Sequence, residues 1–227
     1  MSTDWERFFR ETEEERRRKA LAAGLLGMQQ SPFGQSWLSG QTKRKVFISY
    51  HHKDDDEVTN FVHKWTVNEK VFIPKGIGVT FSYDIINSSN PEYVMSQIRQ
   101  KYLEDSSVTI VLLGSCTHSR RYVDWEIKSS LRQPLGSVPN GLIGIILPSL
   151  GTTAHLPPRF QDNWVEGHAN CYARFYTAPG SADQLRGWIE DAYSARTTRS
   201  RLITNSSDMM KYNATCQVCG IIHPSGD

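Results

Sequence analysis

The sequence lacks the excess of one charge that marks proteins binding nucleic acids. Its 26 Lys and Arg residues are nearly balanced by 24 Asp and Glu residues, so the formal net charge of the 227-residue chain is only +2. A nucleic-acid-binding domain usually carries a basic patch and an isoelectric point above the value near 8.3 found here. We therefore expect neither DNA nor RNA as a partner.

Long apolar segments and a cysteine framework are also missing. The longest apolar stretch, Leu142–Leu150, is interrupted by a proline, and it is about half of the roughly 20 residues that a membrane-spanning helix needs. The chain has 4 cysteines, and its charged N-terminal stretch does not resemble a secretory signal peptide. We expect a soluble, cytoplasmic protein with reduced thiols and no membrane partner.

Neither of the common phosphate-binding loops is present. The sequence contains no G-x-x-x-x-G-K-[ST] motif, and no G-x-G-x-x-G motif follows a predicted strand. These absences exclude a Walker-type NTPase and a typical Rossmann dehydrogenase.

The sequence does contain a regular alternation of apolar strands and amphipathic helices. The predicted strands cover residues 46–51, 77–83, 107–114, 141–147 and 171–176, and the predicted helices cover residues 55–68, 91–104, 120–132 and 181–196. Such alternation predicts a parallel sheet with helices on both faces, and the continuous apolar run Val108–Leu113 favours burial on both sides. The expected fold is α/β, with a five-stranded, mainly parallel sheet in the order 2-1-3-4-5.

Two flanking segments fall outside this alternation. Residues 1–42 predict a helical extension and a linker, because aromatic residues such as Trp5 and Phe8 recur at helical spacing. Residues 197–227 lose the periodicity and are rich in Ser, Thr and Asn, which predicts a loosely attached tail. The α/β domain itself is therefore expected at residues 43–196.

Polar side chains gather where the first and third predicted strands end. The first strand ends in Ser49, Tyr50 and His51, and the third ends in Gly114 and Ser115. In an open α/β sheet of this order, ligands bind in the crevice at the carboxyl ends of these two strands. The sequence therefore predicts a ligand site at this edge.

Acidic residues near the same edge have two interpretations. Asp54–Asp56 suit the cap and the dipole of the helix that follows them. Glu126 lies beside Trp125 in the helix after the third strand, where a carboxylate could stabilise a cationic sugar or hold ribose hydroxyls. On spacing alone, a solvated helical side chain is the simpler interpretation of Glu126.

The C-terminal segment contains three zinc ligands by type, Cys216, Cys219 and His223. They make only half of a metal site, because no second ligand pair accompanies them. Ordinary reduced cysteines are therefore expected, and no metal site is predicted.

Three stretches resemble the TIR-like domain family that includes the TIR subunit of the Thoeris antiphage system (ThsB type). They are Val46–His51 at the first strand, Ser106–Ser115 at the third strand and Arg120–Ile127 in the next helix. The resemblance covers roughly residues 43–150 and implies the flavodoxin-like TIR fold. It includes neither the N-terminal extension nor the cysteines of the tail.

Active members of this family cleave the nicotinamide–ribose bond of NAD⁺ and often join the ADP-ribose into a cyclic signal. The resemblance implies an NAD⁺ nucleosidase and ADP-ribosyl cyclase of antiphage defence, with NAD⁺ as substrate, no cofactor, and a downstream effector reached through the nucleotide signal. The step Trp125-Glu126-Ile127 matches the position of the family's essential glutamate, so Glu126 is the expected catalytic residue. The expected substrate-binding residues are Phe47, Ser49, Tyr50, His51, Asp84, Ser115, Tyr122 and Trp125.

The alternative function is a non-catalytic interaction module, because many TIR domains serve as adaptors. Self-association, or association with other TIR domains, is the expected protein contact. A phosphoacceptor receiver domain shares the flavodoxin-like topology, but Gly114-Ser115-Cys116 stands where its acceptor aspartate would be. A shared fold alone does not imply a shared function.

Overall fold

The structure, a computed structural model, describes residues 42–77, 88, 90–103, 105–132, 138–165 and 171–224. The predicted N-terminal helix and Asp84 lie outside the described residues. The compact unit to which the described strands and helices belong begins at Lys43.

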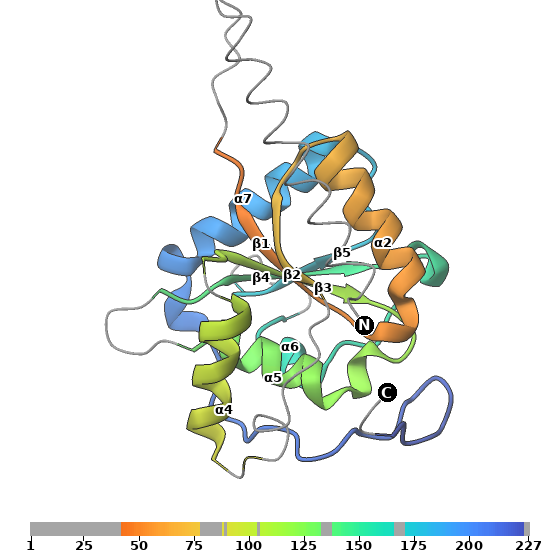
Figure 1. Cartoon of the computed structure of the whole chain (residues 1–227), viewed down its shortest axis with the longest axis vertical. Coiled ribbons are helices and arrows are strands. Elements are labelled where there is room, and N and C mark those ends of the chain that lie inside the picture. Colours follow the sequence, from red (N-terminus) through yellow and green to blue (C-terminus); the bar gives the residue numbers. More distant parts are fainter. Residues whose placement is uncertain are drawn as a thin grey trace, which may run out of the picture. The chain divides into compact units, whose positions relative to one another are not determined.

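A five-stranded sheet in the order β2-β1-β3-β4-β5 runs through this unit (Figure 1). The strands are β1 (Lys45–Ser49), β2 (Ile73–Ile77), β3 (Val108–Leu113), β4 (Gly141–Ile146) and β5 (Arg174–Tyr176). Every neighbouring pair of strands is parallel. The predicted α/β class and strand order are confirmed.

Helices cover both faces of the sheet (Figure 1). One face carries α2 (Asp55–His63) and α7 (Ala182–Thr198), and the other carries α4 (Pro91–Ile98), α5 (Arg121–Ser130) and the short α6 (Pro158–Gln161). Single helical turns complete the described helices: η1 (His52–Asp54), η2 (Lys64–Asn68), η3 (Arg99–Leu103), η4 (Thr117–Ser119), η5 (Pro148–Leu150) and η6 (Ser200–Leu202). No helix among the described residues is long and apolar enough to cross a membrane.

Local sequence signals explain where two of the helices begin. The side chain of Asn90 accepts hydrogen bonds from the backbone N–H groups of Glu92 and Tyr93, at 3.0 and 3.3 Å, and Pro91 occupies the first turn of α4. Ser181 caps α7 in the same way. Polar residues at these positions satisfy N–H groups that the helix itself leaves without partners.

The apolar character of β3 and β4 places both strands in the centre of the sheet. Every residue of both strands is buried. Val111 and Leu113 pack in one core cluster with Val123 and Ile127 of α5. Continuous apolar strands are expected where helices cover both faces of a parallel sheet.

The edge strand β2 includes residues 73–76, which precede the predicted strand at 77–83. Residues 78–83 of the predicted strand at 77–83 lie outside the described residues, and the described residues that pair with β1 are Ile73–Ile77, which include Pro74. Proline is tolerated here because an edge strand has one side that forms no ladder hydrogen bonds.

The segment after α7 is not the loosely attached tail that was expected. It runs beneath α5 (Figure 1), where Trp125 Nε1 donates to the carbonyl of Met210 at 2.8 Å and Lys128 Nζ donates to the carbonyl of Ser207 at 2.5 Å. The Asn213 side chain accepts a hydrogen bond from the backbone N–H of Arg121 at 2.9 Å. Polar residues that suggested a solvated tail instead satisfy donors on α5.

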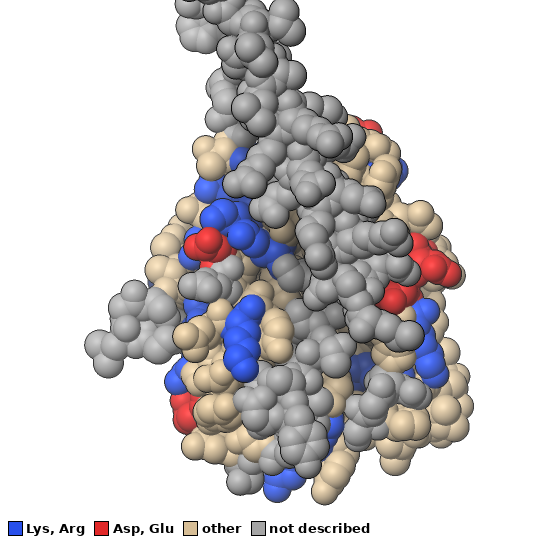
Figure 2. Space-filling view, in the orientation of Figure 1, with Lys and Arg blue, Asp and Glu red and all other residues tan. Residues whose placement is uncertain are grey.

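Charges of both signs are interspersed on the described part of the face drawn in Figure 2. Several described charges pair with each other, including Arg44 with Glu190 at 2.8 Å and Lys45 with Asp105 at 3.1 Å. Exposed pairs of this kind contribute little to stability.

Candidate functional site

The candidate site lies at the carboxyl ends of β1 and β3. The two strands pair directly, with Ser49 opposite Val111, and the chain leaves them through η1 towards α2 and through η4 towards α5. Polar residues from two distant parts of the sequence therefore meet at this edge of the sheet.

Glu126 projects from α5 towards the end of β1. Only 3% of its surface is exposed, and Ser49 Oγ donates a hydrogen bond to Glu126 Oε2 at 2.5 Å. Burial raises the pKa of Glu126 from its ordinary value of 4.5 to about 8, while the hydrogen bond from Ser49 lowers it. Glu126 is therefore not the solvated side chain that spacing alone favoured, and at neutral pH it holds a proton.

Three of the predicted substrate-binding residues, Phe47, Tyr122 and Trp125, pack together as an aromatic layer. Phe47 is fully buried and packs with Trp125 in one core cluster, against which Tyr122 also packs. The rings of Tyr122 and Trp125 meet edge to face at 5.5 Å, and the Arg121 guanidinium lies over both. This layer is packed core rather than an open surface.

His51 lies at the end of β1 and is 3% exposed. Its Nε2 is hydrogen-bonded to Arg120, and its ring meets the rings of His52 and His223 with centroids at 4.4 and 6.0 Å. Burial and then the charge of Arg120 lower the pKa of His51 to about 3. The imidazole is therefore neutral, and Arg120 donates to it. Sequence reasoning did not select Arg120, because nothing in the local pattern shows that this cation is buried.

Asp54 is a second acid at the same edge. It stands at the cap position of α2, as the sequence suggested, but its side chain makes no capping hydrogen bond. The carboxylate instead lies against Gly114, where an added Cβ would come within 2.0 Å of Oδ2. Burial and then the charge of Glu57 raise the pKa of Asp54 to about 6. Gly114 is thus needed for this close approach.

Two other predicted substrate-binding residues have partners of their own. The Tyr50 hydroxyl is hydrogen-bonded to the Asp55 carboxylate. The carbonyl of Ser115 accepts a weak hydrogen bond from Cys216 Sγ at 3.9 Å. Glu126, the predicted catalytic residue, is connected to β1 by the hydrogen bond from Ser49.

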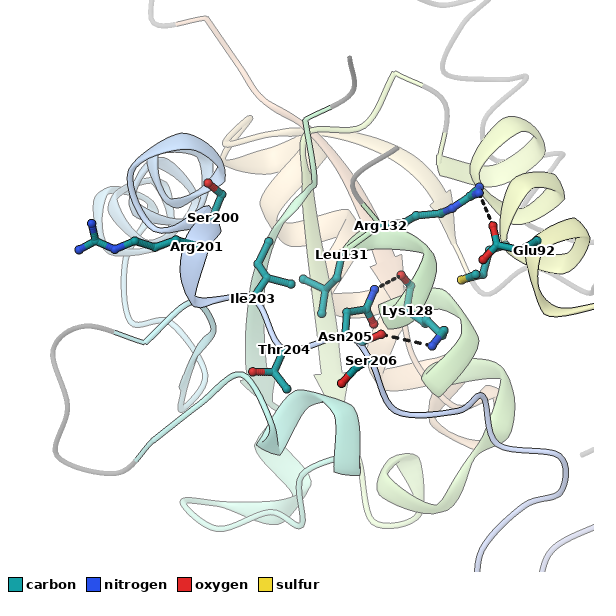
Figure 3. A pocket seen from close by; sticks show the side chains of 11 residues that line it. Glu92, Lys128, Leu131, Arg132, Ser200, Arg201, Ile203, Thr204, Asn205 and Ser206 are labelled. Atoms are coloured by element: carbon teal, nitrogen blue, oxygen red, sulfur yellow. Dashed lines mark hydrogen bonds and ion pairs between the residues drawn. The ribbon is translucent and has the colours of Figure 1, made fainter. Parts of the chain in front are cut away.

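A separate cavity of about 840 Å³ opens between α4, the end of α5 and the segment after α7 (Figure 3). At its rim, Arg132 pairs with Glu92 at 2.5 Å, and Asn205 Nδ2 donates to the carbonyl of Lys128 at 3.0 Å. Glu126 does not line this cavity. The cavity is therefore not an opening to the candidate site.

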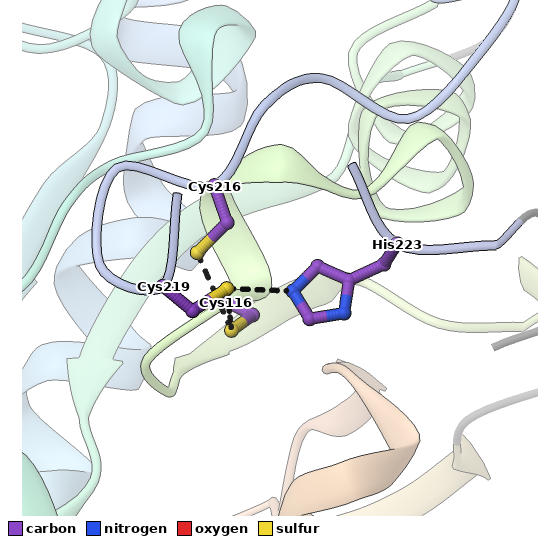
Figure 4. A group of neighbouring side chains, drawn as sticks. All are labelled: Cys116, Cys216, Cys219 and His223. Carbon is purple, nitrogen blue, oxygen red and sulfur yellow. Dashed lines mark hydrogen bonds between the residues drawn. The ribbon is translucent and has the colours of Figure 1, made fainter. Parts of the chain in front are cut away.

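Three cysteines and a histidine converge beside the end of β3 (Figure 4). We call Cys116, Cys216, Cys219 and His223 the Cys/His cluster; their ligand atoms all lie within 4.8 Å of one another. All three thiols are free. Sequence reasoning recognised the last three residues as half of a site, but Cys116 stands 100 positions earlier and gave no spacing signal.

Comparison with known families gives a match to part of the chain. Residues 47–152 match the family described as Thoeris protein ThsB, TIR-like domain. The matched range holds Ser49, Cys116 and Glu126, and it ends before α6, so Cys216, Cys219 and His223 lie outside it. A comparison with curated proteins gives no match. The resemblance predicted from the strand and helix motifs is confirmed.

Proposed function

Because residues 47–152 belong to the TIR-like domain family of the Thoeris protein ThsB, we propose that the chain is an NAD⁺ glycohydrolase and cyclase of antiphage immunity. It cleaves the bond between nicotinamide and ribose and releases nicotinamide. It converts the ADP-ribose part into a signal, cyclic in form, for a downstream effector. NAD⁺ is the substrate, and the proposed reaction needs no cofactor.

The observation that carries this proposal is the buried Glu126 carboxyl group held by Ser49 at 2.5 Å. Cleavage at an anomeric carbon passes through an oxocarbenium-like state, which a nearby carboxylate stabilises. Such stabilisation is strongest where water is excluded and the charged group is already oriented. Ser49 supplies that orientation from the end of β1.

The raised pKa of Glu126 predicts an unusual pH dependence. The ionised carboxylate is the active form, and in the free protein it accumulates only as the pH rises through about 8. We expect kcat/KM for NAD⁺ to rise about tenfold per pH unit below that value and to level off above it, because kcat/KM reports groups of the free enzyme. Initial rates of nicotinamide release between pH 5.5 and 9.5 measure this profile. A profile that is flat from pH 6 to 9 would contradict it.

Ser49→Ala tests how the carboxyl group is tuned. The hydrogen bond from Ser49 lowers the pKa of Glu126, so its removal moves the midpoint of the kcat/KM profile to higher pH. The control is Ser130→Ala. Ser130 lies on α5, the helix of Glu126, and its buried hydroxyl is hydrogen-bonded to Thr109 at 2.7 Å. We expect the control to keep the midpoint of the unmodified protein, and an equal shift in both variants would argue against the Ser49 contact.

The proposed reaction is tested by mass spectrometry of purified protein incubated with NAD⁺, alongside Glu126→Gln. Release of nicotinamide that disappears in the variant supports the proposal, and the masses of the ADP-ribose products distinguish a linear from a cyclic signal. Unchanged release from the variant refutes the role of Glu126. No release from the unmodified protein, also in lysate of phage-challenged cells that express it, refutes the enzyme.

An assembly module is the second candidate, and the burial of Glu126 at 3% exposure favours it. A carboxyl group with so little exposed surface leaves little room for a substrate to reach it. On this interpretation the domain acts through TIR-type contacts between chains. Light scattering after size exclusion, with the full chain and with a chain lacking residues 1–40, measures the assembly. A monomer in both samples counts against this candidate.

A further inference from the structure

The Cys/His cluster has the spacing of a tetrahedral ligand set (Figure 4). Cys116 Sγ lies 3.4 Å from Cys216 Sγ and 4.0 Å from Cys219 Sγ, and Cys219 Sγ lies 3.2 Å from His223 Nε2. Tetrahedral zinc, with Zn–S bonds of about 2.3 Å and Zn–N bonds of about 2.0 Å, places neighbouring ligand atoms roughly 3.5 to 3.8 Å apart. A disulfide would need sulfurs about 2.05 Å apart. The four atoms therefore surround a common centre.

A tight turn presents two of the thiols to this centre. The backbone N–H of Gly220 donates to the carbonyl of Cys216 at 2.9 Å, and Gly220 has a φ of +73°, which favours glycine. The N–H of Cys216 in turn donates to the carbonyl of Ile221 at 2.8 Å. These bonds turn the Cys216 and Cys219 side chains to the same side, as a Cys-x-x-Cys ligand pair requires.

The rest of the segment docks this turn onto η4. The N–H of Gln217 donates to His118 Nε2 at 3.0 Å, and the N–H of Ala214 donates to the carbonyl of Ser119 at 2.9 Å. The side chain of Asn213 donates to the carbonyl of His223 at 3.0 Å. Cys116, in the turn between β3 and η4, thereby meets the three ligands of the C-terminal segment.

Against the expectation of ordinary reduced cysteines, we propose that the Cys/His cluster binds one Zn²⁺ as a structural site. Three thiolates and one imidazole suit zinc by ligand type and geometry. All four positions of the tetrahedron are filled by protein, which is typical of structural rather than catalytic zinc. The ion fastens the C-terminal segment to the end of β3, and this segment in turn contacts α5 through Met210 and Asn213.

Metal analysis of the full chain tests the site. The protein is purified without chelators, and zinc per chain is measured by plasma mass spectrometry for the unmodified protein, Cys219→Ser, His223→Ala and Cys171→Ser. Cys171 is the matched control, because it is a buried cysteine outside the cluster. We expect one zinc per chain in the unmodified protein and in Cys171→Ser, and a loss of most of it in the other two variants.

Cobalt substitution gives a second readout that does not depend on the variants. Co²⁺ in the unmodified protein is expected to show the visible bands of a tetrahedral site and charge transfer from thiolate. Protein that contains no zinc and takes up no cobalt when reduced overturns the proposal. A disulfide between Cys116 and Cys216 in the purified protein, or equal metal loss in Cys171→Ser and Cys219→Ser, also overturns it.

The fastening role is tested by limited trypsin digestion. Lys211 is exposed and lies in the segment that the site holds, where its carbonyl accepts a hydrogen bond from Arg121 at 3.1 Å. We expect a zinc chelator to speed cleavage after Lys211 several-fold in the unmodified protein and in Cys171→Ser. Cys219→Ser is expected to be cleaved fast with and without the chelator. A cleavage rate that is the same in all samples overturns this role.

Discussion

Replacing Glu126 with Gln is expected to abolish nicotinamide release and, in the same protein, to raise thermal stability. The amide keeps the size of the carboxyl group and still accepts the hydrogen bond from Ser49, but it cannot carry the negative charge that stabilises the developing cation. Loss of such a stabilising group costs at least about a hundredfold in rate. Steady-state assays of both proteins at pH 8 measure this loss.

The gain in stability follows from the raised pKa of Glu126. Between its ordinary value of 4.5 and about 8, the folded protein holds a proton that the unfolded chain has lost. The free energy of unfolding therefore falls as the pH rises through this window. The Gln variant does not titrate, so its advantage grows with pH and reaches the order of several kcal/mol near pH 8. Thermal unfolding of both proteins at pH 5, 6.5 and 8 measures the widening gap in Tm.

Glu92→Gln is the matched control for this experiment. The Glu92 side chain is 69% exposed and pairs with Arg132 at 2.5 Å, so its neutralisation is expected to leave nicotinamide release intact and the difference in Tm nearly independent of pH. A constant difference in Tm between Glu126→Gln and the unmodified protein from pH 5 to 8 would show that Glu126 is ionised in the folded state.

The fold could be predicted because its strongest signals are local. Val108–Leu113 is apolar at every position, and only a strand covered on both faces buries all of them. The position of β2 could not be predicted in the same way. Pro74 is disfavoured in most strands, and only the place of β2 at the edge of the sheet makes it acceptable. That place depends on the assembled sheet.

The same difference between local signals and features of the assembled fold applies to the candidate site. Ser49 could be selected from its place at the end of an apolar strand. Glu126, on α5, could be selected only through the resemblance of Trp125-Glu126-Ile127 to the family motif, because its spacing alone predicts a solvated side chain. The convergence of Cys116 with Cys216 could not, since a turn and a distant segment carry no shared periodicity. The buried ion pair of Asp124 could not be predicted either. Its partner, Arg159, lies on the four-residue helix α6, which is too short to show a helical pattern in the sequence.

Arg159→Met is expected to destabilise the fold more than any surface substitution. Arg159 Nε donates to Asp124 Oδ1 at 2.8 Å, and the two side chains are only 2% and 3% exposed. Arg159 Nη2 also donates to the carbonyl of Asp208 at 2.8 Å, and Asp124 accepts from the backbone N–H of Met210 at 2.9 Å. The variant leaves the Asp124 charge buried without its partner, which costs about 3 to 5 kcal/mol. For a domain of this size, Tm falls by roughly 10 °C.

Two further variants separate the ion pair from the loss of any arginine. Arg186→Met removes the partner of Asp183, whose side chain is 94% exposed, and a change of at most about 1 kcal/mol is expected. Arg159→Met combined with Asp124→Leu removes both charges, so it is expected to recover part of the stability, because an apolar pair of similar volume replaces a buried ion pair at little cost. Denaturant unfolding followed by circular dichroism measures all three free energies. A double variant less stable than Arg159→Met would show that Asp124 contributes mainly through Met210, and that the C-terminal segment holds α5 without help from the arginine.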